Sequence, residues 1–466
     1  MTSPAARGPF RAYVETYGCQ MNAADGELMR GVLAADGYEI VDVPDQADVV
    51  LVNTCAIRER AESRVIGRVG ELKRLKRDNP DLLIGVTGCM AQRMGAALLE
   101  KAPHVDLVMG PDGYRTLPER LRELRTGTGD GGDVPERTRR PRRVQLAVLE
   151  LDDTEHYEGL EQRRQSDVTA WIPIQRGCDH RCTFCIVPYV RGPEKNRAPS
   201  DVLKEVTELA GAGITEVTLL GQTVNSYKSG EWAFPRLLRA VARVDGVRRV
   251  RFTSPHPNDV SEDLVEVMAS EAAVCEQLHL PVQSGSDRTL RRMARKYSVE
   301  GLLNTVAMVR DAIPDIALST DVIVGFPGET EGDFEQTLDL MRCVRFDEAY
   351  TYKYSLRDGT PAARLPAADF LPDSERQLRL EALISVTRQI QLEINQQELG
   401  RVDEILVEGA ARYAGQLRGK TRRNKVVAFP SECERVGDYV QVRLTGTSGA
   451  TFSAELAEAP SLVELA

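Results

Sequence analysis

The stretch WIPIQRGCDHRCTFC, residues 171–185, is the most informative part of this sequence. It joins a short apolar strand to three cysteines, Cys178, Cys182 and Cys185, in the spacing CxxxCxxC. A structural zinc site almost always has four ligands, and within this loop only His180 could add one. A four-iron cluster held by three cysteines instead keeps one iron open for a small molecule with an amine and a carboxylate. The spacing therefore favours an iron-sulfur site over a zinc site.

Further strand-like runs follow this loop, with helical stretches between them. Together with residues 171–174, we predict strands over the following ranges: 217–220, 250–253, 277–280, 318–324 and 349–354. Six βα units predict an incomplete (β/α)6 barrel, because a closed barrel of this type needs eight. A long charged helix is then predicted over residues 373–399.

The first part of the chain has a similar alternation of strands and amphipathic helices, which predicts a parallel α/β sheet. Strands are expected at residues 13–16, 49–52 and 83–87. Cys19, Cys55 and Cys89 each follow one of these strands by a few residues.

Since the carboxyl ends of parallel strands share one edge of the sheet, these cysteines are expected to converge as a second three-cysteine site. Gly18 and Gly88 suit tight turns that present a thiolate. The alternative is that these thiols are small buried side chains without a ligand. We assign Cys275, Cys343 and Cys433 to packing.

Composition shifts divide the chain, an α/β protein, into four parts. We predict a sheet domain over residues 10–127, a linker rich in Gly, Pro and Arg over 128–163, a barrel core over 164–400 and a small antiparallel β-barrel over 401–466. A chain of 466 residues exceeds what one hydrophobic core usually supports.

Charge and hydropathy limit the partners of this protein. The formal net charge of -10 disfavours non-specific binding of nucleic acid, so any RNA contact has to come from a local basic patch. No apolar run approaches the roughly 20 residues of a spanning helix, and the N-terminus lacks a signal core. We therefore expect no membrane partner and a cytoplasmic, reducing location.

A basic run in the last domain is the candidate RNA patch. Between residues 411 and 425 there is no acidic residue, and Tyr413 adds an aromatic ring that could stack on a base. The candidate RNA-binding residues are Arg418, Lys420, Arg422, Arg423 and Lys425. Such a run is also compatible with an ordinary solvated face.

These motifs resemble a known family. CxxxCxxC with Phe184 before the last cysteine, at the opening of a partial barrel, is similar to the signature of radical S-adenosylmethionine (SAM) enzymes. The texts TYGCQMN (16–22), NTCAIR (53–58) and GCMAQ (88–92) resemble the methylthiotransferases, and within them the branch that modifies tRNA. The last domain resembles the TRAM module, a β-barrel associated with RNA binding.

The resemblance implies a reaction and its cofactors. It implies two 4Fe-4S clusters and SAM, with the six cysteines as metal ligands and no side chain acting as the catalyst. The implied reaction is methylthiolation of carbon 2 of N6-isopentenyladenosine next to the anticodon of tRNA. The implied partners are the tRNA, an electron donor such as flavodoxin or ferredoxin, and a sulfur donor.

Two further interpretations of the function stay open. One is a methylthiotransferase for a ribosomal protein or for threonylcarbamoyladenosine in tRNA. The other is a non-enzymatic iron-sulfur protein that binds RNA or transfers electrons, although such carriers usually hold each cluster with four cysteines.

Gln222, just after a predicted strand, is a candidate SAM ligand by position. The loop at residues 326–330 could flank the cofactor or simply lead into a helix.

Overall fold

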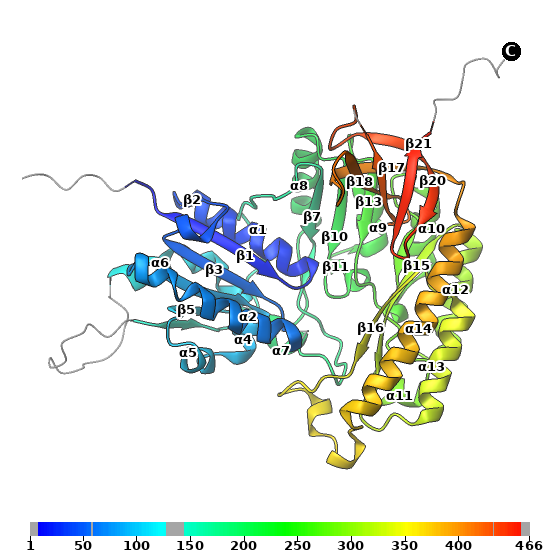
Figure 1. Cartoon of the computed structure of the whole chain (residues 1–466), viewed down its shortest axis with the longest axis horizontal. Coiled ribbons are helices and arrows are strands. Elements are labelled where there is room, and N and C mark those ends of the chain that lie inside the picture. Colours follow the sequence, from blue (N-terminus) through cyan, green and yellow to red (C-terminus); the bar gives the residue numbers. More distant parts are fainter. Residues whose placement is uncertain (1–7, 57–58, 127–143, 432, 458–466) are drawn as a thin grey trace, which may run out of the picture. The chain divides into compact units, whose positions relative to one another are not determined.

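The structure, a computed structural model, describes residues 8–56, 59–126, 144–431 and 433–457. It divides into two compact units. The N-terminal unit comprises residues 1–165, 175–180 and 186–197, and the C-terminal unit comprises residues 166–174, 181–185 and 198–466. The small β-barrel predicted as a separate domain lies within the C-terminal unit (Figure 1).

The N-terminal unit is built on a six-stranded parallel sheet with the order β2-β1-β3-β4-β5-β6, as the alternating pattern predicted. Its sheet strands are β1 (Arg11–Tyr17), β2 (Glu39–Ile40), β3 (Val49–Thr54), β4 (Leu83–Gly88), β5 (Leu107–Met109) and β6 (Leu146–Val148). Its helices are α1 (Gln20–Ala35), α2 (Glu59–Leu72), α3 (Leu75–Asp78), α4 (Cys89–Met94), α5 (Ala97–Lys101), α6 (Leu117–Thr126) and α7 (Val187–Arg191). A short ribbon, β8 (Gln175–Arg176) with β9 (Lys195–Asn196), completes it.

Strand β3 shows why this sheet is parallel and covered on both faces. All six of its residues are buried. Val49 and Leu51 belong to the apolar cluster with α1 and α6, whereas Val50 and Val52 belong to the cluster with α2. Because side chains alternate along a strand, a run of apolar residues indicates helices on both faces.

The predicted linker over residues 128–163 is wrong in part. Residues 127–143, with the arginine-rich run, lie outside the described residues. Residues 146–148 form β6, which pairs with β5. A three-residue strand is too short to show a periodicity in sequence, so the pattern could not reveal it.

The C-terminal unit contains the predicted partial barrel. Its six strands are β7 (Thr169–Pro173), β10 (Glu216–Leu220), β13 (Arg249–Phe252), β14 (Gln277–His279), β15 (Ala317–Val324) and β16 (Glu348–Lys353). They form two parallel three-stranded sheets, β13-β10-β7 and β14-β15-β16, and the backbones of residues 250 and 273–275 connect the two. The helices are α8 (Pro199–Gly211), α9 (Phe234–Ala242), α10 (Glu262–Ser270), α11 (Asp287–Arg292), α12 (Val299–Ala312), α13 (Glu331–Val344) and α14 (Asp373–Gln397). A hairpin of β11 (Lys228–Ser229) and β12 (Trp232–Ala233) precedes α9.

Strand β15 shows the two sides of this barrel wall. Leu318, Val322 and Val324 are buried in the main apolar cluster with the surrounding helices, whereas the alternate residues Ser319 and Asp321 are only partly buried. A barrel wall with one dry and one half-open face produces this alternation.

The last part of the chain forms a closed five-stranded barrel with its own apolar core. Its strands are β17 (Val402–Ala410), β18 (Gln416–Thr421), β19 (Val426–Pro430), β20 (Tyr439–Thr447) and β21 (Thr451–Leu456). The prediction of an antiparallel barrel is wrong for one pair, because β19 and β21 run parallel where the barrel closes.

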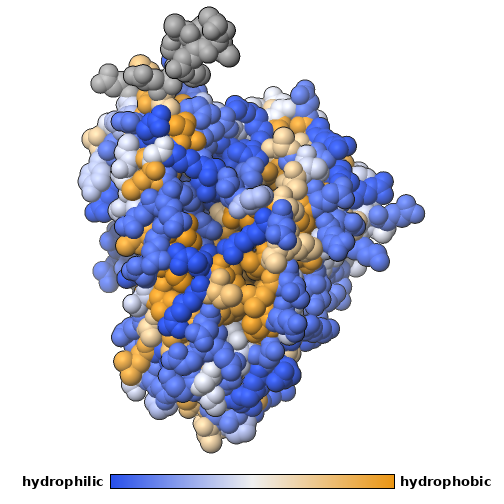
Figure 2. Space-filling model, turned by 90° about the vertical axis from the view of Figure 1, so that its right-hand side faces the viewer, coloured by the Kyte–Doolittle hydropathy of each residue, from blue (hydrophilic) through white to orange (hydrophobic). Residues whose placement is uncertain are grey.

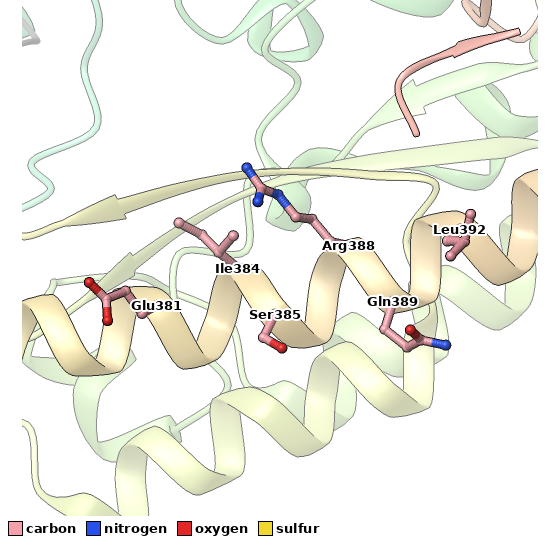
Figure 3. Close-up of a pocket in the computed structure, with 6 residues that line it drawn as sticks. All are labelled: Glu381, Ile384, Ser385, Arg388, Gln389 and Leu392. Atoms are coloured by element: carbon pink, nitrogen blue, oxygen red, sulfur yellow. The ribbon is translucent and has the colours of Figure 1, made fainter. Parts of the chain in front are cut away.

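Helix α14 lines a surface pocket that contains none of the candidate cysteines. Figure 2 shows apolar surface gathered in a hollow between hydrophilic ridges on the face that it draws. A pocket of about 520 Å³ is lined by residues of α14 alone: Glu381, Ile384, Ser385, Arg388, Gln389 and Leu392 (Figure 3). None of the described helices is long and apolar enough to cross a membrane.

Candidate metal centres

Cys19, Cys55 and Cys89 lie just beyond the ends of three neighbouring strands. β1, β3 and β4 are adjacent and parallel, and their register puts the last residues of the three strands in one row. Cys55 and Cys89 follow that row by one residue and Cys19 by two. The three cysteines therefore meet at one edge of the sheet, as their positions after three strands predicted.

The three thiols have different environments. A hydrogen bond from Cys55 lowers the pKa of Cys19 to about 6, and the nearby charge of Arg191 acts in the same direction. Burial raises the pKa of Cys89, although Arg191 opposes this effect. A thiolate is the form that binds metal. The environment of this edge favours the thiolate of Cys19, whereas Cys89 is buried away from water.

Glycine and asparagine shape this edge. Gly18 (φ +138°) and Gly88 (φ +91°) have positive φ values, as expected for the turns that present the thiolates. A Cβ on Gly88 would lie 2.4 Å from Asn53 Oδ1. The Asn53 amide donates to the carbonyl of Asn22 at 2.7 Å, and the Asn22 amide donates to the carbonyl of Thr54 at 3.0 Å. The cysteine edge is thus held by a buried polar network.

Arg191, which sequence reasoning missed, is the residue that indicates whether an anionic group fits at this edge. Its side chain is 2% exposed, and its Nε donates to Cys89 Sγ at 3.1 Å. Its Nη1 is buried and has no hydrogen-bond partner among the described residues. A buried guanidinium N–H without an acceptor, on a side chain that binds the sulfur of Cys89, fits a sulfur-rich anionic cluster.

The second set of cysteines lies on the loop between β8 and α7. Cys185 N–H donates to the carbonyl of Cys182 at 3.1 Å, which closes a turn. Thr183 anchors this turn in the C-terminal unit through a backbone hydrogen bond to Met293. Arg295, also missed in the sequence, donates from Nη1 to Cys182 Sγ at 3.4 Å and is 9% exposed.

Cys178 belongs to the N-terminal unit. Its N–H donates to the carbonyl of Gly192 at 3.2 Å. Gly177 before it has a φ of +73°, and a Cβ there would lie 1.8 Å from the carbonyl oxygen of Pro193. Only glycine fits at that position.

Gln222 follows the end of β10 by two residues, as expected. Its Oε1 is buried and has no hydrogen-bond partner among the described residues. An unsatisfied acceptor beyond the carboxyl end of a barrel strand fits a ligand with N–H or O–H donors.

The loop at residues 326–330 leads into a helix, the second of its two predicted roles. Thr330 caps α13 in a capping box with Asp333. Glu329 is buried, accepts from the N–H of Gly325 at 2.8 Å and pairs with Arg379 at 2.8 Å. These residues hold α14 against the loop.

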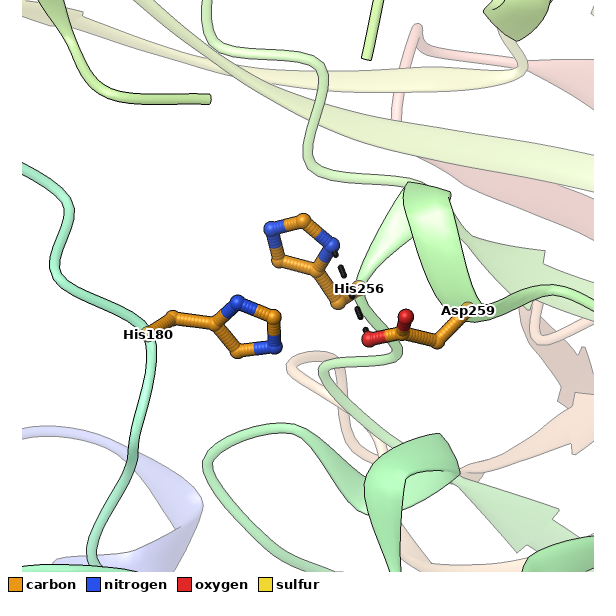
Figure 4. A group of neighbouring side chains, drawn as sticks. All are labelled: His180, His256 and Asp259. Atoms are coloured by element: carbon orange, nitrogen blue, oxygen red, sulfur yellow. Dashed lines mark ion pairs between the residues drawn. The ribbon is translucent and has the colours of Figure 1, made fainter. Parts of the chain in front are cut away.

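The histidine next to η4 (Pro257–Asp259) is also structural. His256 Nδ1 lies 3.8 Å from the carboxylate of Asp259 (Figure 4) and accepts from the N–H of Asn258. His180, which Figure 4 also draws, belongs to the N-terminal unit, and its position relative to His256 is not described.

The basic run of the small barrel is largely engaged inside the chain. Four of the five candidate residues have carboxylate partners: Lys420 with Glu408 (3.3 Å), Arg422 with Glu276 (2.8 Å), Arg423 with Glu398 (2.7 Å) and Lys425 with Asp347 (2.8 Å). In addition, Arg249 and Arg251 of β13 donate to the carbonyls of residues 420–422. Arg418 is exposed, and so are Arg412 and Tyr413 at the turn before β18.

Of the remaining cysteines, only Cys275 is buried. The assignment of Cys343 and Cys433 to packing is wrong, because both are exposed. Helical and strand-like patterns around them could not show which face each residue takes.

Comparison with known families covers nearly the whole chain. Residues 11–110 match the uncharacterized protein family UPF0004, residues 172–341 the radical SAM superfamily and residues 396–456 the TRAM domain. The tRNA-2-methylthio-N(6)-dimethylallyladenosine synthase of Carboxydothermus hydrogenoformans is 45% identical over 93% of this chain and 96% of that protein. The synthase of the same name from Mycobacteroides abscessus is 43% identical over 96% of this chain and 89% of its own length. The chain belongs to this synthase family.

Solved structures extend the likeness in fold alone. TsrM from Kitasatospora setae, a radical SAM methyltransferase, superposes with a TM-score of 0.55 at 18% identity over 76% of this chain and 77% of its own. The radical SAM enzyme OxsB gives a TM-score of 0.53 at 13% identity over 82% of this chain and 58% of its own.

Membership in the synthase family makes this chain a radical SAM enzyme whose cofactors are two 4Fe-4S clusters and SAM. The chain has two separate sets of three cysteines, which are the candidate ligands of these clusters. Sequence reasoning predicts all six cysteines as ligands from their spacing and their positions after strands. It missed Arg191 and Arg295 because each lies more than 100 residues from the cysteine it contacts.

Proposed function

We propose that this chain transfers a methylthio group to carbon 2 of N6-isopentenyladenosine next to the anticodon of tRNA. The observation that supports this most directly is the three-cysteine edge of the N-terminal sheet, in a chain that also carries the CxxxCxxC loop. The family name specifies the isopentenylated adenosine, which favours it over a ribosomal protein or threonylcarbamoyladenosine.

We propose that each cysteine trio holds one cluster. Cys19, Cys55 and Cys89 hold the first cluster. The loop cysteines Cys178, Cys182 and Cys185 hold the second. When bound, the clusters and SAM supply the radical chemistry and the transferred sulfur. The chain keeps one iron of each cluster free of protein ligands, and it shields the buried thiolates from water.

Gln222 is our candidate for a direct contact with SAM. Its unsatisfied Oε1 suits a donor on the nucleoside or on the amino group of SAM. Replacing it by leucine of similar size is expected to raise the KM for SAM, because the acceptor is lost.

We propose that RNA binding by the small barrel depends on Arg418, with Lys420, Arg422, Arg423 and Lys425 holding the barrel in place through their carboxylate partners. Arg418 is exposed and can reach a phosphate. Arg418→Glu should raise the dissociation constant for tRNA and reduce its salt slope by about one. The matched control is Arg342→Glu, an exposed arginine on α13, which should leave both unchanged. Equal effects of the two variants would refute a specific contact.

Two further partners follow from the chemistry. Cleavage of SAM consumes an electron, which a flavodoxin or ferredoxin would supply, and each product takes up one sulfur atom, which needs a sulfur donor. Since the substrate is tRNA, we place the protein in the cytoplasm.

Mass spectrometry of tRNA nucleosides tests the proposed function. Cells that lack this protein should lose 2-methylthio-N6-isopentenyladenosine and accumulate the isopentenyl precursor. The wild-type chain should restore the product, whereas a chain with alanine at Cys19, Cys55 and Cys89 should not. Unchanged nucleosides in the deletion strain would refute the proposal.

A further inference from the structure

Arg191 connects three elements of the N-terminal unit around the first cysteine trio. It ends α7, its Nη2 lies 2.5 Å from Asp25 Oδ2 of α1, and its Nε donates to the sulfur of Cys89 at the start of α4. Both members of the ion pair are almost fully buried, with side chains 2% and 3% exposed. One guanidinium thus reaches a carboxylate and a cysteine ligand at the same time.

An ion pair that only fastens α7 to α1 does not account for this arrangement. The third nitrogen, Nη1, is buried and lacks a partner among the described residues. Buried donors in folded proteins nearly always have an acceptor. The planar fork of arginine presents its donors in fixed directions, so an acceptor for Nη1 has to lie near those already bound.

We propose that Arg191 is a positioning residue for the cluster held by Cys19, Cys55 and Cys89, an inference that rests on the proposed function. Its Nε orients the sulfur of Cys89, its Nη1 is available to a sulfur that the protein does not supply, and Asp25 fixes the guanidinium. Hydrogen bonds to sulfur and a nearby positive charge stabilise the reduced, more negative state of a cluster. Arg191 therefore raises the reduction potential of this cluster, and the charge of Asp25 lowers it.

Redox titration followed by electron paramagnetic resonance tests this role. The full-length chain with Cys178, Cys182 and Cys185 all replaced by alanine carries only the first cluster. In this background R191M should shift the midpoint potential to a more negative value and change the spectrum of the reduced cluster. R191K keeps the charge without the fork and should give a smaller shift. D25N removes the opposing charge and should shift the potential in the positive direction.

The matched control removes a buried ion pair from the other end of the sheet. Lys76 Nζ lies 2.5 Å from Asp106 Oδ2, and Asp106 accepts from the N–H of Ile84 near the start of β4. K76M should leave the potential and the spectrum unchanged.

Opposite shifts in R191M and D25N support the proposal. Unchanged potentials in both variants, each with full iron content, would overturn it. If R191M fails to bind iron, D25N decides alone, because a positive shift supports the proposal and no shift overturns it. A parent chain that binds no iron at all would overturn the assignment of Cys19, Cys55 and Cys89 to a cluster, a different result from loaded variants with unchanged potentials.

Discussion

The two cysteine trios are built in different ways. The first is assembled by the tertiary fold, because Cys19, Cys55 and Cys89 come from three strands of one sheet. The second is contained in the eight residues from Cys178 to Cys185. The first site thus depends on the packing of the whole sheet, whereas the second depends on how one loop is anchored.

The two trios also differ in how the positive charge of the neighbouring arginine is compensated. Arg191 is paired with the carboxylate of Asp25, so the net charge of the pair is close to zero. Arg295 donates to Cys182, to the carbonyl of Pro281 at 2.7 Å and to the hydroxyl of Tyr297 at 3.1 Å, and none of these partners is a carboxylate. The positive charge of Arg295 is therefore less compensated than that of Arg191.

Removing one trio at a time gives the largest expected effect. Replacing Cys19, Cys55 and Cys89 by alanine should halve the iron content, from about eight to about four per chain, and abolish methylthiolation. Production of 5′-deoxyadenosine from SAM and a reductant should persist. The matching triple variant of the loop should also halve the iron content, but it should abolish both reactions.

Iron analysis and chromatography of the products measure these outcomes. If the sheet variant lost 5′-deoxyadenosine production at full occupancy of the other cluster, the separation of roles between the trios would be wrong.

Gly88→Ala should damage the first trio and leave the second intact. Alanine at φ +91° costs about 1 to 3 kcal/mol. The Cβ would also lie 2.5 Å from the carbonyl oxygen of Thr54 and 2.4 Å from Asn53 Oδ1, which adds about 1 to 3 kcal/mol of overpacking. Gly37→Ala is the control, because Gly37 has a similar φ of +88° with nothing within 4 Å of its Cβ. Thermal unfolding and iron content should separate the two variants, and equal losses would show that backbone strain alone matters.

The difference between the trios also explains what the sequence could reveal. A motif within eight residues is visible by spacing, and the first trio became visible because Cys19, Cys55 and Cys89 share a position after strands. Arg191 and Asp25 are 166 residues apart, so no local pattern connects them. The basic run of the small barrel predicted an RNA-binding patch for a related reason. The charges along the chain do not show that Arg422 has Glu276 as its partner.

A comparison of Arg295→Met with Arg191→Met tests whether the two arginines act on their clusters alike despite their different partners. Each variant is examined with only the neighbouring cluster loaded. Both should lower the reduction potential by a similar amount, because each variant removes one positive charge and one hydrogen bond to a cysteine sulfur, whether or not a carboxylate lies nearby. The loss of one charge-assisted hydrogen bond, about 1.5 kcal/mol, corresponds to about 60 mV for a one-electron couple. A shift at only one of the two sites would contradict this account of the two arginines.

The anchoring of the loop gives the smallest expected effect. Thr183 of the loop binds the backbone of Met293 at the end of α11, and Arg288 and Ser286 at the start of α11 bind Asp333 of α13. Burial tends to raise the pKa of Asp333, but hydrogen bonds from Arg288, Ser286 and Thr330 outweigh this and hold the pKa below its usual value.

A lowered pKa means that Asp333 stabilises the fold above the ordinary carboxyl pKa of about 3.9, and that this stabilisation is lost as the pH falls through the lower folded value. Asp333→Asn should therefore reduce the thermal midpoint of the iron-free chain at pH 7 and weaken its fall in acid. The variant should also retain less iron at the loop trio than at the sheet trio, because only the loop is anchored through α11. Equal retention at both trios would show that Asp333 does not help to hold the loop.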